Sequence, residues 1–197
     1  KVFFVKAAPA YWVVLDWLES KPENDYRAWF HGCVPGGLDG TTILLEGADG
    51  ARLAVLPPEG DAVTATQVTP DGLAAYIRER RLQPEQYPGF VYGRRAASDC
   101  LVWVLMPLAQ GARVPRVRRL PVTVNGIAED PHGAAAVEIR HADGTADTLC
   151  VSHKDFDAEM AFGNDHAWGF LAFRRRDPVG RLTFSIEHVM PDGVCGR

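Results

Sequence analysis

The amino-acid sequence predicts an all-β protein, namely an antiparallel β-sandwich of two or more packed sheets with at most one or two short helices. Short runs rich in β-branched and aromatic residues recur along the chain, and Gly, Pro, Asn and Asp separate them. In several places two such runs flank a short turn sequence, which is typical of a β-hairpin. Helical periodicity is rare. Together these observations favour packed antiparallel sheets.

The first predicted strands lie at the start of the chain. Val2–Val5 is a short apolar run, and residues 11–19 form a second one. The sequence SKPEND then predicts a turn, because Pro, Asn and Asp favour turn conformations. Residues 26–34 follow as the next strand. We expect the strands at 11–19 and 26–34 to be adjacent and antiparallel.

Three further hairpins are predicted from their turn sequences. The turns are ADG at residues 48–50, Asp143-Gly144, and the segment 177–180. The sequence GLDG at 37–40 predicts a turn, and EDPHG at 129–133 predicts a loop. One helix of two or three turns is expected in TPDGLAAYIRERRL, residues 69–82, although Gly72 weakens it.

One acid, Asp16, interrupts the apolar run at 11–19. A buried charge is costly unless it is paired, so we expect this carboxylate to be hydrogen-bonded or ion-paired. Side chains alternate along a strand, which puts Arg27, Trp29 and His31 on one face. Pairing of the two strands would bring that face next to Asp16. Arg27 is therefore the expected partner, followed by Trp29 or a backbone N–H.

Composition narrows the classes of function. The chain has 197 residues, which we interpret as a single domain over residues 1–197. The formal net charge of −4 argues against nucleic acid as a partner. No apolar run approaches the ~20 residues that span a membrane, so no membrane partner is expected. The chain opens without Met inside a predicted strand, which we interpret as the C-terminal part of a longer chain.

The cysteines and histidines show no metal-site spacing. No C-x-x-C, H-x-H or H-E-x-x-H motif occurs, so no metal or other cofactor is expected in this chain. The cysteines at 33, 100, 150 and 195 are interpreted as small buried thiols rather than disulfides. The hairpin at Asp143-Gly144 could bring His141 and His153 together, but surface histidines are the favoured interpretation.

Arginine clusters and tryptophans have two interpretations each. Arg can bind carboxylate or sulfate groups of an anionic polysaccharide in a bidentate manner, but it can also pair with surface acids. Consecutive residues on a strand face opposite sides, so the run Arg174–Arg176 cannot line one groove. Tryptophans can stack on sugar rings. Trp103, between Val102 and Val104, is instead expected in the core.

The order of motifs resembles the C-terminal part of the heparinase II/III family of polysaccharide lyases. Tyr11-Trp12-Val13-Val14 with Asp16 resembles the family's Tyr-Trp-Val-Val-x-Asp line, and Phe30-His31 resembles the Phe-His end of its next strand. The later segments GFVYGRRAASDCLVWVLMPLAQG and AWGFLAFRRRDPVGRLTFSIEHVMPDG match at the level of pattern, so the resemblance spans most of the chain. HGCVPGG departs from it, which puts the role of His31 in question.

This resemblance implies the β-sandwich of a two-part bacterial enzyme that degrades uronic-acid polysaccharides, such as glycosaminoglycans or alginate, by β-elimination. The catalytic Asn, His and Tyr residues, and any metal, would belong to an α/α-toroid upstream of Lys1. That toroid is the expected partner, and a periplasmic or secreted location is favoured. The family's Gly-His-x-His-x-Asp and His-Asn-Thr motifs are absent from this chain.

Within this chain the expected polysaccharide-binding residues are Arg27, Trp29, His31 and Arg94, and His31 is the one candidate for catalysis. The alternative is a free-standing carbohydrate-binding or scaffolding module without chemistry. A helical segment upstream carrying His, Tyr and Asn would favour the lyase. The sequence does not distinguish heparan from alginate or other uronates.

We predict that the isolated chain has no lyase activity, because it lacks the catalytic motifs of the family. Incubation with heparan sulfate, alginate or hyaluronan should give no increase in the absorbance of unsaturated uronate. Growth of that product, and its loss in His31→Ala, would contradict the prediction and make His31 catalytic.

Overall fold

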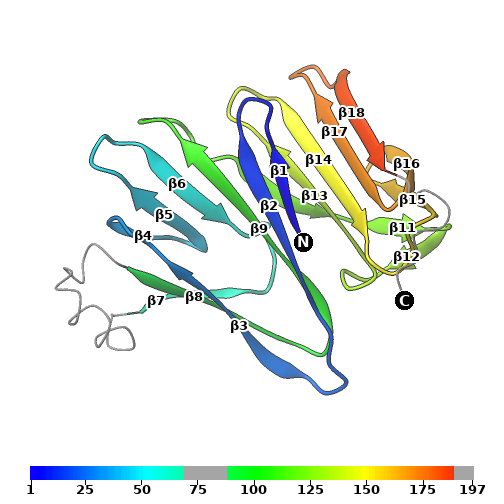
Figure 1. Ribbon diagram of the computed structural model, residues 1–197, viewed down its shortest axis with the longest axis horizontal. Helices are drawn as coiled ribbons and strands as arrows, with labels where there is room; N and C mark the ends of the chain where they lie inside the picture. Colours follow the sequence, from blue (N-terminus) through cyan, green and yellow to red (C-terminus); the bar gives the residue numbers. More distant parts are fainter. Residues whose placement is uncertain (69–87, 189–197) are drawn as a thin grey trace. The chain divides into compact units, whose positions relative to one another are not determined.

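The computed structural model describes residues 1–68 and 88–188, and in these ranges the regular structure consists of β-strands without any helix (Figure 1). The strands form several packed sheets with antiparallel pairing, for example β5 with β6 and β13 with β14. The predicted all-β antiparallel sandwich is therefore confirmed. The helix predicted at 69–82 lies outside the described residues.

Contacts along the chain divide it into two compact units. The first comprises Lys1–Asp16, Ser20–Ala97 and Leu101–Val114, and the second comprises Trp17–Glu19, Ser98–Cys100 and Pro115–Arg197. Each unit contains its own pair of sheets. The interpretation of residues 1–197 as one domain stays a prediction.

The first unit has a six-stranded and a three-stranded sheet. The larger sheet has the order β1-β2-β9-β6-β5-β4. Its strands are β1 (Val2–Val5), β2 (Tyr11–Leu18), β9 (Asp99–Leu108), β6 (Arg52–Leu56), β5 (Thr42–Glu46) and β4 (Gly36–Asp39). The smaller sheet has the order β3-β8-β7, formed by β3 (Asn24–His31), β8 (Gly89–Ala96) and β7 (Thr64–Val68).

The second unit has a five-stranded and a four-stranded sheet. The five-stranded sheet has the order β10-β13-β14-β17-β18. Its strands are β10 (Arg116–Leu120), β13 (Ala134–Arg140), β14 (Ala146–Ser152), β17 (Leu171–Arg176) and β18 (Leu182–His188). The four-stranded sheet has the order β12-β11-β15-β16, formed by β12 (Ile127–Glu129), β11 (Val122–Val124), β15 (Ala158–Phe162) and β16 (Asp165–Gly169).

Most local predictions hold, but one strand pairing was wrong. The three turns predicted from ADG, Asp143-Gly144 and 177–180 join the hairpins β5–β6, β13–β14 and β17–β18. However, β2 and β3 are not neighbours, because β2 lies between β1 and β9 while β3 pairs with β8. The turn between them carries the chain from one sheet to the other. GLDG is also mostly strand β4, and its turn lies at Gly40–Thr41.

The core of the first unit is built around Trp103, which is 1% exposed, as its apolar neighbours predicted. Phe30 from β3 packs edge-on against this indole with a ring-centre distance of 5.5 Å, and Tyr92 from β8 lies at 4.6 Å. Such aromatic contacts add to the free energy of area burial. Trp103 belongs to the six-stranded sheet, so these contacts join the two sheets of the unit.

Asp16 is hydrogen-bonded, as predicted, but its partner is Trp103 rather than Arg27. The Trp103 Nε1 donates to Asp16 Oδ2 at 3.1 Å. The expectation of Arg27 failed because it depended on pairing β2 with β3. Asp16 itself is exposed, so its carboxylate stays hydrated while it accepts the N–H of a buried indole. The acid in the apolar run therefore satisfies a donor from the core.

The core of the second unit lies between its two sheets. Met160 and Phe162 of β15 and Val122 of β11 pack with Ala136 of β13 and Cys150 of β14. All five are buried. The side chains on the five-stranded sheet are small and those on the four-stranded sheet are larger. This complementarity lets the two sheets pack closely.

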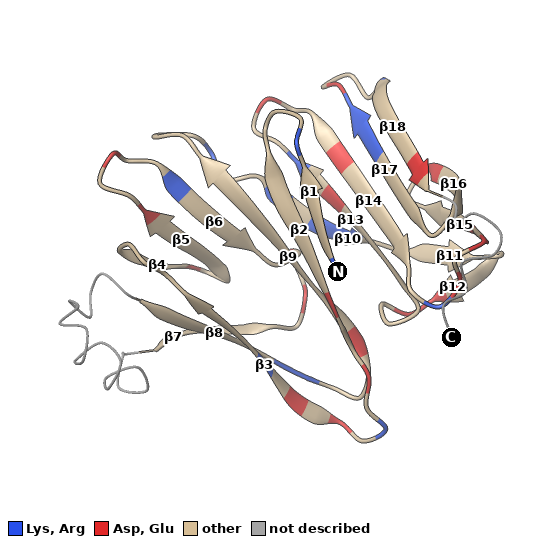
Figure 2. Cartoon of the chain, in the orientation of Figure 1, with Lys and Arg blue, Asp and Glu red and all other residues tan. Residues whose placement is uncertain are grey.

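The three consecutive arginines of β17 each pair with a different acid. Arg174 pairs with Glu187, Arg175 with Asp147, and Arg176 with Asp165 at 2.5 Å. Arg175 reaches the fully buried Asp147 through two bonds of 2.6 Å, from Nε and from Nη2. Figure 2 shows the basic run on β17 and the acid on β14. The three arginines do not line one groove, as the alternation predicted, and Arg174 is buried rather than solvated.

We predict that Asp16→Ala lowers the free energy of unfolding by about 1–3 kcal/mol, because the buried Trp103 N–H then loses its acceptor. Asp16→Asn is the matched control, since it keeps an acceptor oxygen and should cost under about 1 kcal/mol. Urea unfolding measures both values. Equal stability of Asp16→Ala and the parent chain would show that the bond contributes nothing.

A second prediction concerns acid stability. Partial burial raises the pKa of the Glu138 carboxyl, but hydrogen bonds and charges from Arg118 and Arg140 outweigh it, so the net pKa is lowered. Stability from this group is therefore present above the unfolded-state pKa, about 4.3, and is lost as the pH falls through the lowered value. Between pH 7 and pH 3, the Glu138→Gln variant should lose less free energy of unfolding than the parent chain does. The difference between the two losses should be about 1 kcal/mol or less, because Arg118 is exposed. Identical losses in urea unfolding would contradict this.

Candidate functional site

Three of the predicted binding residues form an exposed row on β3. Arg27, Trp29 and His31 alternate with the less exposed Ala28 and Phe30, so they share the outer face of the three-stranded sheet. Trp29 is 53% exposed. Its ring lies nearly parallel to that of His31, with 6.3 Å between the ring centres and 18° between the planes. Among residues 1–68 and 88–188, Arg27 forms no ion pair, so its guanidinium is available to bind an anionic ligand.

The strands beside this row carry small side chains on the same face. Gly93, Val91 and Gly89 of β8 lie opposite Arg27, Trp29 and His31 in turn. On β7, Thr64 and Thr66 continue this face next to Gly93 and Val91. This face therefore carries exposed aromatic rings along β3 and hydroxyl groups along β7. We call the outer face of β3, β8 and β7 the β3 face.

Neighbouring side chains leave no room for a larger residue at either glycine. A Cβ at Gly93 would lie 2.8 Å from Thr64 Oγ1, and one at Gly89 would lie 2.8 Å from a methyl group of Val68. Glycine inside a strand often marks a place where another chain or a ligand approaches the backbone closely. At these two glycines the close groups are the Thr64 and Val68 side chains of β7.

The β3 face is supported from below by the core. Phe30 lies between Trp29 and His31 in sequence, points to the opposite side, and packs against Trp103. The Tyr92 hydroxyl donates to the Thr41 carbonyl at 2.5 Å, and burial raises its pKa, so it stays protonated as a donor. Side chains with fixed neighbours hold the strand in place, so the exposed row is preorganised.

Arg94 does not join the other predicted site residues. It lies opposite Tyr26 in the β3–β8 register, which puts it on the inner side of the sheet. Arg95 lies opposite Asp25 on the β3 face, where its Nε donates to Glu23 Oε2 at 3.0 Å. The sequence placed an arginine correctly on β8 but could not determine which of the two faces outward.

The histidines are arranged differently from the prediction. His141 and His153 do not meet, because His141 lies at the turn end of the β13–β14 hairpin and His153 lies at its open end. His141 is buried and bonded to Asp147 at 2.9 Å. His153 stacks on Trp17 at 4.4 Å and lies 6.0 Å from the His132 ring. His132 is also buried. The expectation of surface histidines was therefore wrong for His141, because the sequence does not reveal its buried acid partner.

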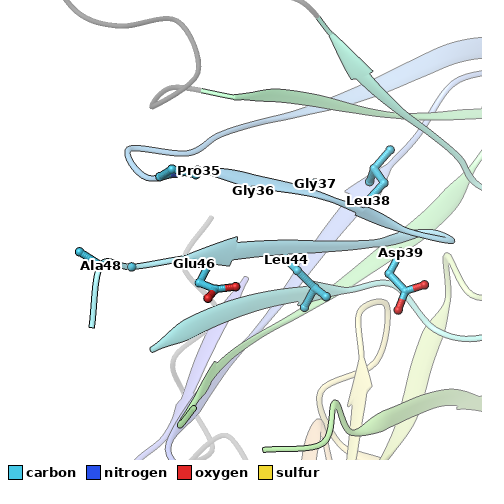
Figure 3. Close-up of a pocket in the computed structure, with 9 residues that line it drawn as sticks. Pro35, Gly36, Gly37, Leu38, Asp39, Leu44, Glu46 and Ala48 are labelled. Atoms are coloured by element: carbon cyan, nitrogen blue, oxygen red, sulfur yellow. The ribbon is translucent and has the colours of Figure 1, made fainter. Parts of the chain in front are cut away.

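An open pocket of about 810 Å³ lies along β4 and β5 (Figure 3). Its lining is mostly backbone and small or apolar side chains, with Asp39 and Glu46 as the charged residues. Among the described residues, its lining includes no Lys, Arg or His. This lining offers no means of neutralising a substrate carboxylate, which makes the pocket a poorer candidate for uronate than the β3 face.

The described part of the chain shows no metal site and no catalytic group of cysteines. No three His, Cys, Asp or Glu side chains in it gather to hold a metal ion. Cys33 is exposed, against the expectation of a buried thiol, whereas Cys100 and Cys150 are buried. Burial raises the pKa of the Cys150 thiol, which keeps it protonated and unreactive. Over the same ranges, the structure contains no helix with the length and hydropathy of a membrane span.

Comparison with models of protein families and with curated proteins gives no match for this chain.

Proposed function

We propose that this chain binds an anionic, uronic-acid-containing polysaccharide on the β3 face, as the β-sandwich part of a heparinase II/III-like lyase. The observation that carries the proposal is the exposed row of Arg27, Trp29 and His31, which lies opposite Gly93, Val91 and Gly89 of β8. An aromatic ring can stack on the apolar face of a sugar, and a guanidinium can hold a carboxylate through two hydrogen bonds. A strand spaces alternate side chains by about 6.6 Å, so the two contacts fall on nearby parts of one polymer.

In this proposal the β3 face binds and orients the polymer, while β-elimination takes place in an associated catalytic domain. Elimination needs neutralisation of the substrate carboxylate, a base for the C5 proton and an acid for the leaving oxygen. Arg27 supplies a charge for the first requirement. His31 has an imidazole next to Trp29, and it forms no ion pair with a described residue. Binding without chemistry, as in a free-standing carbohydrate-binding module, is the second candidate, and this lack of a partner for His31 favours it.

The test measures binding of the full chain to alginate, heparan sulfate and hyaluronan by affinity gel electrophoresis and calorimetry. Trp29→Ala and Arg27→Gln should each weaken binding about tenfold or more, since a hydrogen bond to a charged group contributes about 1.5–3 kcal/mol. Affinity should also fall with added salt.

Arg113→Gln is the matched control, because it removes one exposed positive charge away from the β3 face. Its affinity should stay within about twofold of the parent chain. Equal losses in Arg113→Gln and Arg27→Gln would mean that the polymer responds to net charge alone. No binding to any of the three polymers would contradict the proposal.

A further inference from the structure

A second exposed tryptophan lies in the other unit, on the outer face of the four-stranded sheet. Trp168 of β16 is 50% exposed, while the preceding Ala167 is buried in the core between the two sheets. The alternation of β16 therefore turns the indole away from the core. An exposed residue of this size is informative when its surroundings fix it in one position.

Hydrogen bonds hold Trp168 in place. The indole Nε1 donates to Asp157 Oδ1 at 2.5 Å, and the backbone N–H donates to Glu187 Oε2 at 3.3 Å. Glu187 is held in turn by the buried Arg174. The polar edge of the indole is satisfied within the protein, which leaves the ring face as its available binding surface.

The residues around Trp168 include acidic acceptors, the small Ala161 and the exposed imidazole of His166. Glu159 of β15 lies directly opposite Trp168 and is exposed. In the next row across the sheet, His166 lies opposite Ala161, and Ala161 lies opposite Thr123 of β11. The ring is thus flanked by the carboxylates of Asp157 and Glu159. We call this arrangement the Trp168 face.

We propose that the Trp168 face is a second glycan-binding site, one that takes neutral sugars. The ring can stack on the C–H face of a pyranose, and the Glu159 carboxylate can accept hydrogen bonds from sugar hydroxyls, which are charge-assisted and strong. The same carboxylates repel uronates, because like charges close to a site oppose binding. The proposal does not depend on the function assigned to the β3 face, where Arg27 is the neighbour of Trp29 on the exposed row.

The experiment compares the full chain with Trp168→Ala, Trp168→Phe and Glu159→Gln by affinity gel electrophoresis. The probes are a soluble β-glucan, a galactomannan and a soluble starch, with alginate as the anionic probe. At least one neutral glycan should retard the parent chain. Trp168→Ala should weaken that binding tenfold or more, and Glu159→Gln should weaken it several-fold. Trp168→Phe keeps an aromatic ring and should fall between Trp168→Ala and the parent.

Trp12→Ala, which removes another exposed tryptophan on β2, is the control, and it should bind the neutral glycan as the parent chain does. Trp168→Ala should likewise keep any alginate binding, which separates failure of this site from failure of the β3 face. No retardation by any of the three neutral glycans overturns the proposal. So does neutral-glycan binding that survives in Trp168→Ala, or unchanged binding in Glu159→Gln.

Discussion

The buried indole of Trp103 joins the two sheets of the first unit, and the hydrogen bond to Asp16 sets its orientation. Phe30 and Tyr92 rest against this ring, and each belongs to a strand of the β3 face. The position of the exposed row on β3 thus depends on a core contact that lies beneath it. A carboxylate at the surface accepts a donor from the core, which makes the apolar packing compatible with the polar N–H of the indole.

Features that depend on neighbouring residues in the chain were predictable from the sequence. The two-residue period of a strand correctly placed Arg27, Trp29 and His31 on one face. Turn residues correctly located three hairpins, because Gly and Asp favour the backbone conformations of tight turns.

Features that depend on distant residues could not be derived in this way. The partner of Asp16 is 87 positions away in the chain, and nothing local identifies it. The side that Arg94 faces follows from the register of β8 against β3, which local alternation does not determine. The same holds for His141, whose buried acid becomes its neighbour only through the strand pairing of the second unit.

The pairing of each arginine on β17 with its own acid affects how this protein presents charge to its surroundings. In the sequence, Arg174–Arg176 is the densest basic stretch, and it would be expected to attract a polyanion from a distance. In the folded chain each guanidinium is matched by a carboxylate within a few ångströms. The field of such a pair fades within the screening length of about 10 Å at 0.1 M salt. The most basic stretch of the sequence therefore contributes little to long-range electrostatic steering. Arg27, which has no ion pair with any described residue, keeps its full charge for attracting an approaching polymer.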